Sequence, residues 1–261
     1  MENERVLELE SVHNFRDYGG YDVAGGGRLR KGLLWRSGHH YGASEADLAK
    51  IGALALETVI DLRGNSERTN CPSPRPAGCK ADVRFYDGET AGLAPHLAAA
   101  EGVLDAEGAR KAMLWLYEDI AFRPSLTSVL RDLFALALAR DGASLVHCHA
   151  GKDRTGIAVA LVHHIAGVHR DDIFDDYLLT NVVGNNEKRI ADAVGQQSDS
   201  ATFARIPEAA IRVLMNVDAA FLDTAFRAIE DRHGSIDLYL NEVLDLHAAA
   251  REQVRERLIE G

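Results

Sequence analysis

Apolar residues recur at helical spacing in one early segment, residues 44–56. Leu48, Ile51 and Leu54 fall on one face of a helix, and Ser44 precedes them as a plausible N-cap. The spacing therefore predicts an amphipathic helix that packs one side against a core.

Shorter apolar runs predict strands. The β-branched run at 57–63 ends before a glycine and predicts a buried strand, and the run at 82–87 predicts a weaker one. Residues 143–150, ASLVHCHA, predict a central strand, followed by an apolar helix that stops near Gly167. The glycine-rich stretch at 12–38 predicts short strands joined by turns.

Longer segments predict helices between and after these strands. A helix is predicted from Pro124 to Gly142, and the chain from Asp171 to its end has a helical pattern, with breaks at Pro207 and Gly234. Alternating strands and helices followed by a helical tail predict an α/β fold, with a central, mostly parallel sheet flanked by helices. No linker divides residues 1–261, so we expect a single domain.

The composition limits the function. The formal net charge is −11, which disfavours nucleic acid as a partner because a phosphate backbone needs a basic surface. An anionic substrate would need attraction built into the site itself. No apolar run is long enough to span a membrane, and the acidic N-terminus lacks the zones of a signal peptide. The cytoplasm is the default location, although export without a signal would leave no trace in the sequence.

Three cysteines occur, which is too few for a disulfide framework. Cys71 and Cys79 lie in a proline-containing loop, and we expect free thiols there rather than a bridge or a metal site. Cys148 is different, because it ends the predicted central strand.

The stretch HCHAGKDRTG, residues 147–156, carries the chemistry. A strand ends at Cys148, a short loop follows and a helix begins, which is where open α/β sheets bind ligands. Backbone N–H groups at such a helix N-terminus bind a tetrahedral oxyanion, and Gly151 allows a close backbone approach. Arg154 adds a two-point contact for phosphate oxygens. The same positive environment lowers a thiol pKa, so Cys148 would form a nucleophilic thiolate to which Thr155 could donate its hydroxyl.

This stretch resembles the Cys-x5-Arg-Thr-Gly signature of the cysteine-dependent tyrosine and dual-specificity phosphatases. It is most similar to a bacterial branch that includes phosphoinositide phosphatases. Other stretches resemble the framework of that branch in the same order, so the resemblance covers most of the chain and is weak only across about 70–125 and 185–215. These stretches are NFRDYGGY, LLWRSG, VIDLRGNSER, DDYLLTN and GSIDLYLNEVLDL.

The resemblance implies the phosphatase fold and a two-step reaction that needs no metal or cofactor. Cys148 would form a phosphocysteine, Arg154 would hold the equatorial oxygens, and His147 would support the loop. The backbone around the phosphate, here called the phosphate cradle, would come from His149, Ala150, Gly151, Lys152, Asp153 and Arg154.

Two aspartates compete for the general acid. The resemblance favours Asp153, which lies in the cradle, and Asp61 is the alternative by its position after a strand. Asp153 could also simply orient Arg154. Asp61 could instead pair with Arg63 or Arg16 as framework, and Asp17 is a similar framework candidate.

Lys152 bears on the substrate. A flexible cation beside the cradle suits a second phosphate, which implies phosphoinositides as well as phosphorylated protein. The alternative is a solvated residue at the rim of the site. The sequence leaves the oligomeric state open.

Two weakly matching stretches, 88–121 and 185–215, have a helical, partly apolar pattern and are candidate helical insertions. In the family branch such helices form a lid that would limit thiolate oxidation and gate substrates. Ordinary helical decoration is the alternative.

Other functions compete with the phosphatase. A rhodanese-like sulfurtransferase also uses a cysteine at such a junction, but the Arg-Thr-Gly ending argues against it. A catalytically silent phosphate-binding module is disfavoured by the intact Cys148 and Arg154. A metal site at His147, Cys148 and His149 is unattractive, since neighbouring residues of a strand point to opposite faces.

Overall fold

The computed structural model describes residues 4–90, 105–139, 141–196 and 206–261. A five-stranded sheet lies at its centre, in the order β1-β3-β6-β4-β5. Strand β1 runs antiparallel to β3, and the other neighbouring pairs are parallel, so the mostly parallel sheet is confirmed. The strands are β1 (Arg16–Asp17), β3 (Leu34–Ser37), β4 (Thr58–Asp61), β5 (Asp82–Phe85) and β6 (Ser144–His147).

The register aligns the ends of three strands. His147 at the end of β6 is paired with Ser37 of β3 on one side and with Asp61 of β4 on the other. The residues that follow these strands therefore emerge at one edge of the sheet, and Cys148 is in the middle of them.

Alternate residues of the central strands enter two separate cores. Val59 and Leu145 pack with Ile51 of α1 (Glu45–Ala53) on one face. Ile60 and Val146 face the larger core on the other side. The N-cap of α1 is confirmed, because the Ser44 hydroxyl accepts a hydrogen bond from the Asp47 N–H at 3.1 Å.

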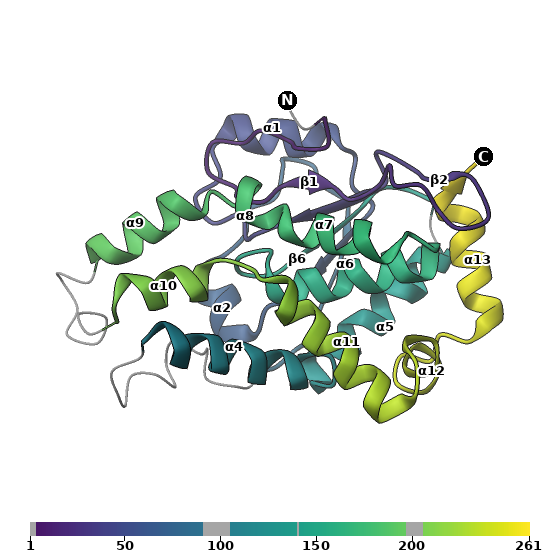
Figure 1. Cartoon of the computed structure of the whole chain (residues 1–261). Coiled ribbons are helices and arrows are strands. Elements are labelled where there is room, and N and C mark those ends of the chain that lie inside the picture. The colour runs from purple at the N-terminus through teal and green to yellow at the C-terminus, as the bar shows by residue number, and fades with distance from the viewer. Residues whose placement is uncertain (1–3, 91–104, 140, 197–205) are drawn as a thin grey trace.

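Helices cover the larger core (Figure 1). They are α5 (Pro124–Ala139), α6 (Asp153–Ala166), α7 (Arg170–Leu178), α11 (Ala219–His233), α12 (Ile236–Glu242) and α13 (Ala248–Leu258), with the short α8 (Thr180–Val183) after α7. The glycine expected to stop α6 does so: Gly167 has a φ of 83° and caps the helix.

Helices in both insertions lie side by side near the cradle end of the sheet (Figure 1). They are α4 (Ala106–Ile120), α9 (Asn186–Gln196) and α10 (Glu208–Met215), and α2 (Asn65–Asn70) is nearby. A small core joins them, made of Ala109, Ile190, Ile206, Ala210 and Ile211. Helix α4 also packs on the larger core through Met113, Tyr117 and Ile120. Much of the first insertion, residues 91–104, and residues 197–205 of the second lie outside the described residues.

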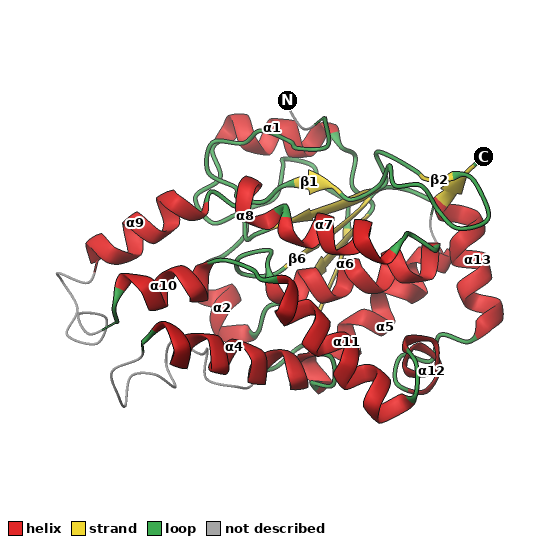
Figure 2. Ribbon diagram, in the orientation of Figure 1, coloured by secondary structure: helices red, strands yellow, loops and turns green. Residues whose placement is uncertain are grey.

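The expectation of helix up to the end of the chain is wrong for the last residues. Ile259 and Glu260 form β7, which pairs antiparallel with β2 (Arg28–Leu29) in a two-stranded sheet (Figure 2). The helix ends at Leu258, and the backbone of the last residues instead pairs with β2.

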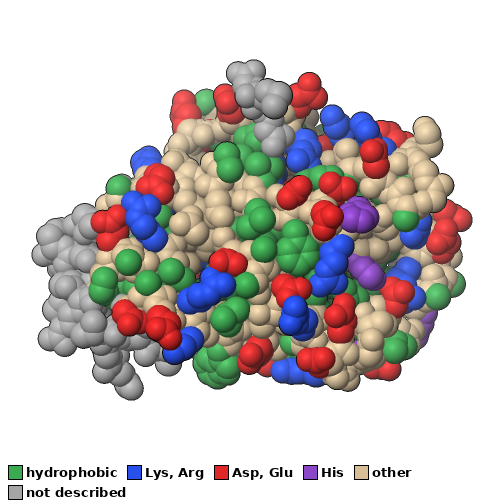
Figure 3. Space-filling view, viewed as in Figure 1, with side chains coloured by type: hydrophobic (Ala, Val, Ile, Leu, Met, Phe, Trp, Pro, Cys, Tyr) green, Lys and Arg blue, Asp and Glu red, His purple; other side chains and the backbone are tan. Residues whose placement is uncertain are grey.

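The described helices include none with the length and hydrophobicity that a bilayer crossing requires. On the face shown in Figure 3, acidic and basic side chains are interspersed rather than gathered by sign.

Candidate active site

Cys148 directly follows the central strand β6, and α6 begins five residues later at Asp153. The thiol side chain is buried. The first N–H groups of a helix have no acceptor within the helix and carry a partial positive charge, so they can bind an anion. The predicted strand, loop and helix are therefore in place around the cysteine.

Gly151 is the residue on which the loop turns. Its φ is +65°, and a Cβ there would lie 2.4 Å from the backbone oxygen of Ser37. Only glycine fits this conformation and this contact with the β3 end. The carbonyl of Gly151 accepts hydrogen bonds from Asn14 Nδ2 at 2.7 Å and from Arg36 Nη2 at 3.0 Å.

A buried ion-pair network supports that carbonyl. Arg36 Nη1 lies 2.6 Å from Asp176 Oδ2, and Arg16 Nε lies 3.4 Å from Asp176 Oδ1. Burial acts to raise the pKa of Asp176, but the two guanidinium groups lower it well below the usual value. The network joins three of the stretches quoted for the resemblance behind the carbonyl of Gly151. Arg16 pairs with Asp176 and not with Asp61.

Arg154 projects from the first turn of α6 and is held by Glu67 of α2. Arg154 Nη1 donates to Glu67 Oε2 at 2.6 Å and Nη2 donates to Glu67 Oε1 at 2.7 Å, while Nη1 also donates to the Leu62 carbonyl at 2.9 Å. Burial acts to raise the pKa of Glu67, but its bonds with Arg154 lower it to about 2. The sequence analysis missed Glu67, although it lies in the quoted stretch VIDLRGNSER.

Asp153 begins α6 and contacts two other side chains. The Tyr117 hydroxyl of α4 donates to Asp153 Oδ1 at 2.7 Å, and Lys152 Nζ lies 3.5 Å from the same oxygen. Tyr117 also shares a 2.7 Å hydrogen bond with the hydroxyl of Tyr177. Burial raises the pKa of Tyr117 well above its usual value, so it remains a donor. Tyr117, which the sequence did not single out, thus holds Asp153 in one orientation.

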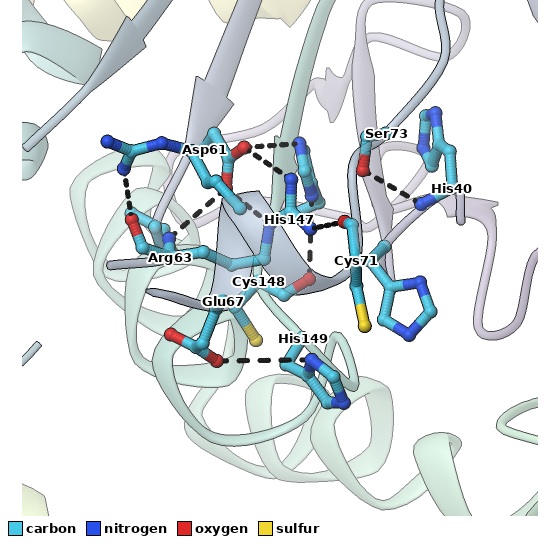
Figure 4. A network of polar contacts seen from close by, with 12 residues as sticks. His40, Asp61, Arg63, Glu67, Cys71, Ser73, His147, Cys148 and His149 are labelled. Carbon is cyan, nitrogen blue, oxygen red and sulfur yellow. Dashed lines mark hydrogen bonds and ion pairs between the residues drawn. The ribbon is translucent and has the colours of Figure 1, made fainter. Parts of the chain in front are cut away.

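Asp61 is committed elsewhere. Its carboxylate bonds Arg63 at 2.8 and 2.7 Å and lies 3.7 Å from His147 Nε2 (Figure 4). Burial acts to raise its pKa, but His147 and Arg63 lower it to about 2, so it holds no proton at neutral pH. These contacts fit the framework alternative. Asp17 is also framework, because it accepts hydrogen bonds from the N–H groups of Gly19 and Gly32.

His147 lies beneath the cradle and is fully buried. Its ring stacks on His40 with centroids 5.3 Å apart, and burial lowers its pKa to about 4. Its position fits the expected supporting role. His149 is more exposed, and its carbonyl accepts a hydrogen bond from the His39 N–H at 2.9 Å.

Lys152 is buried, so the solvated rim alternative is wrong. Its ammonium donates to the carbonyls of Leu214 and Asn216, at 2.5 and 3.3 Å, in and just after α10. Burial lowers its pKa. Lys152 therefore links the cradle to the second insertion.

The buried polar atoms that lack a hydrogen-bond partner among the described residues include two that bear on the reaction. The Thr155 hydroxyl is buried without a hydrogen bond, and so is Nη1 of Arg189 on α9. Burial lowers the pKa of Arg189, while the charges of Asp153 and Cys148 raise it. The guanidinium is therefore close enough to these two residues to interact with their charges. Arg189 was missed because a helical arginine in a weakly matching stretch gives no signal.

Comparison with known proteins agrees with this geometry. Residues 7–260 match the model of the tyrosine phosphatase family. A Cupriavidus necator protein that carries a tyrosine-protein phosphatase name is 33% identical, over 98% of this chain and 89% of its own. The triple specificity protein phosphatase PtpB of Mycobacterium tuberculosis is 29% identical, over 91% of this chain and 93% of its own. A tyrosine-protein phosphatase of Nostoc commune is 47% identical over 52% of this chain and 44% of its own. These matches argue against the sulfurtransferase alternative. The chain belongs to the tyrosine phosphatase family and is a phosphatase.

Proposed function

We propose that this phosphatase hydrolyses phosphotyrosine through a phosphocysteine at Cys148. One observation carries the proposal: Cys148 is buried between the end of β6 and the start of α6, with Arg154 oriented beside it by Glu67. The family match over residues 7–260 supports a single phosphatase domain.

The reaction follows from these groups in two displacements. The Cys148 thiolate attacks phosphorus, the bond from phosphorus to the ester oxygen breaks, and Asp153 gives its proton to that oxygen. Arg154 binds two phosphoryl oxygens while charge builds on them. Water then attacks the phosphocysteine, Asp153 takes its proton, and the thiolate leaves. The unpartnered Thr155 hydroxyl is available to donate to that sulfur.

The mechanism is tested with p-nitrophenyl phosphate and the variant Cys148→Ser. We expect the variant to bind phosphate and to lose at least about 1,000-fold in kcat. Rapid acid quenching of the native enzyme should trap one phosphoryl group on Cys148. The control Cys79→Ser, an exposed cysteine, should be fully active. Full activity in Cys148→Ser would reject the nucleophile, and turnover of thiosulfate instead of phosphate would favour the sulfurtransferase.

We also propose a wider substrate range, which includes phosphoserine, phosphothreonine and phosphoinositides. The guanidinium of Arg189 supports it, because its buried Nη1 has no hydrogen-bond partner among the described residues and would favour a second anionic group on the substrate. Lys152 contributes by holding α10 next to the cradle. The relative PtpB, named a triple specificity phosphatase, supports the same range.

A comparison of kcat/KM across phosphotyrosine, phosphoserine and phosphoinositide substrates tests this range. Arg189→Met should lose about tenfold or more on phosphoinositides and much less on p-nitrophenyl phosphate. Lys152→Ala separates its two roles: a loss confined to phosphoinositides supports a substrate contact, and an equal loss on all substrates supports positioning alone. Lys188→Met, an exposed neighbour on α9, is the matched control.

A further inference from the structure

Three side chains that the phosphatase reaction does not use converge beside the cradle. They are His39, which follows β3, Cys71 at the end of α2, and His149 of the cradle. One ligand atom of each lies within 4.8 Å of the others. The two imidazole rings are in contact, with centroids 4.6 Å apart. Figure 4 shows the sulfur of Cys71 on the side of the loop that faces His149.

Neighbouring groups bear on the position of each member. His149 Nδ1 lies 4.0 Å from Glu67 Oε1, which is too long for a hydrogen bond. The backbone of Cys71 is held at both polar groups, because its N–H donates to the Glu67 carbonyl at 3.0 Å and its carbonyl accepts from Arg63 Nη1 at 2.6 Å. His39 Nδ1 accepts from the exposed N–H of Tyr41, a bond that the solvent can replace.

The donor set selects the metal. Two imidazoles and one thiolate suit Zn²⁺, whereas Ca²⁺ and Mg²⁺ require oxygen ligands. Zinc bonds of about 2.0–2.3 Å place tetrahedral ligands about 3.3–3.8 Å apart, so these atoms need to close by about 1 Å, which side-chain rotation of two half-exposed histidines allows. Three protein ligands leave a fourth position for water.

We propose that His39, Cys71 and His149 form an inhibitory Zn²⁺ site at the mouth of the phosphate cradle. Binding releases the thiol proton of Cys71 and forms three metal–ligand bonds, with no redox step. His149 is the residue next to Cys148, so an ion that fixes its side chain toward Cys71 restricts entry to the nucleophile. Inhibition rests on the proposed function, whereas zinc binding does not.

Zinc binding is measured first, by competition with a chromophoric chelator, in full-length Cys148→Ser protein so that the nucleophile cannot ligate the ion. We expect one equivalent of zinc to bind, and binding to weaken at least tenfold when Cys71→Ser or His39→Ala is added. Co²⁺ should give a thiolate charge-transfer band that Cys71→Ser removes. The exposed Cys79→Ser is the control and should leave the affinity unchanged. Zinc affinity that survives both Cys71→Ser and His39→Ala overturns the site.

Inhibition is measured second, with native Cys148 and p-nitrophenyl phosphate. Zinc should inhibit competitively with phosphate, a chelator should restore the rate, and Cys71→Ser should raise the inhibitory concentration at least tenfold. Equal zinc inhibition in Cys71→Ser would overturn the inhibitory role even if the binding data hold. Absence of any phosphatase activity in the metal-free enzyme would instead count against the proposed function.

Discussion

Glu67 contacts both terminal nitrogens of Arg154, at 2.6 and 2.7 Å. The two residues come from different helices, α2 and α6. The guanidinium plane is thereby fixed by a carboxylate that does not itself need to touch the substrate. Such preorganisation lowers the cost of binding the transition state.

Glu67→Gln should keep the shape of this contact but weaken it. The loss of a charge-assisted pair predicts a fall in kcat/KM of about tenfold to a hundredfold, measured with p-nitrophenyl phosphate. Glu89→Gln is a suitable control, because Glu89 bonds Ser66 nearby and does not contact Arg154. Equal activity of the two variants would show that the orientation of Arg154 does not depend on Glu67.

Asp153→Asn should slow substrates according to their leaving groups. An alkyl or phenyl oxygen needs a proton, so kcat should fall about 100-fold or more for phenyl phosphate and little for p-nitrophenyl phosphate. Asp61→Asn should show no such dependence, because Asp61 bonds Arg63 and its pKa is about 2. A leaving-group effect found in Asp61→Asn and not in Asp153→Asn would reverse the assignment.

Gly151→Ala should abolish the cradle by a local clash. The new Cβ would lie 2.4 Å from the Ser37 oxygen, in addition to the strain of a φ of +65°. We expect an activity loss of more than about 100-fold, with unfolding measured in parallel. Gly25→Ala tests the strain alone, since Gly25 also has a positive φ but no atom within 4 Å of a Cβ. Gly25→Ala should lower the free energy of unfolding by about 1 kcal/mol and leave the activity intact.

Buried histidines should make the fold sensitive to acid. The pKa of His147 is about 4 in the folded protein and about 6.5 when unfolded, so between these values the unfolded chain binds more protons. Stability is therefore full above about pH 6.5 and falls as the pH drops toward 4. The contribution of His147 is about 3 kcal/mol, and denaturant titrations across this window should show a shallower pH dependence in His147→Asn.

Ile211→Ala tests the lid. The small core joins α4, α9 and α10, but α4 is also held in the main core through Met113 and Tyr117. A cavity at Ile211 should therefore loosen α9 and α10 against α4 while the sheet stays folded. If they cover Cys148, peroxide should inactivate the variant about tenfold faster. Ile229→Ala makes a comparable cavity where α11 packs on the main core, and it serves as the control. Unchanged peroxide sensitivity in Ile211→Ala would favour helical decoration.

The sequence was sufficient for the elements that depend on local pattern. Ser44 and Gly167 specify the ends of their helices through neighbours in the chain, and the structure has both as predicted. The strand predicted at 143–150 is present and spans Ser144–His147. The support of the site depends instead on residues far apart. Glu67 and Tyr117 reach the cradle only through the packing of α2 and α4, and no spacing in the sequence encodes which carboxylate meets which arginine.

The short strand β7 was missed for a related reason. Two residues cannot show a period, and their pairing partner Arg28–Leu29 lies near the other end of the chain. The charge of Lys152 suggests a substrate role, whereas its burial and its contacts with the carbonyls of Leu214 and Asn216 depend on tertiary structure.

The carbonyl of Gly151 gathers donors from Asn14, 137 positions earlier, and Arg36, 115 positions earlier, and Arg36 is in turn held by Asp176. The cradle thus depends on contacts between residues far apart in the sequence, so it cannot form in a chain that has folded only its helices. During refolding, helical signal should return before turnover does. Recovered activity therefore reports the late formation of long-range contacts. Helical content measured alone would not detect that step.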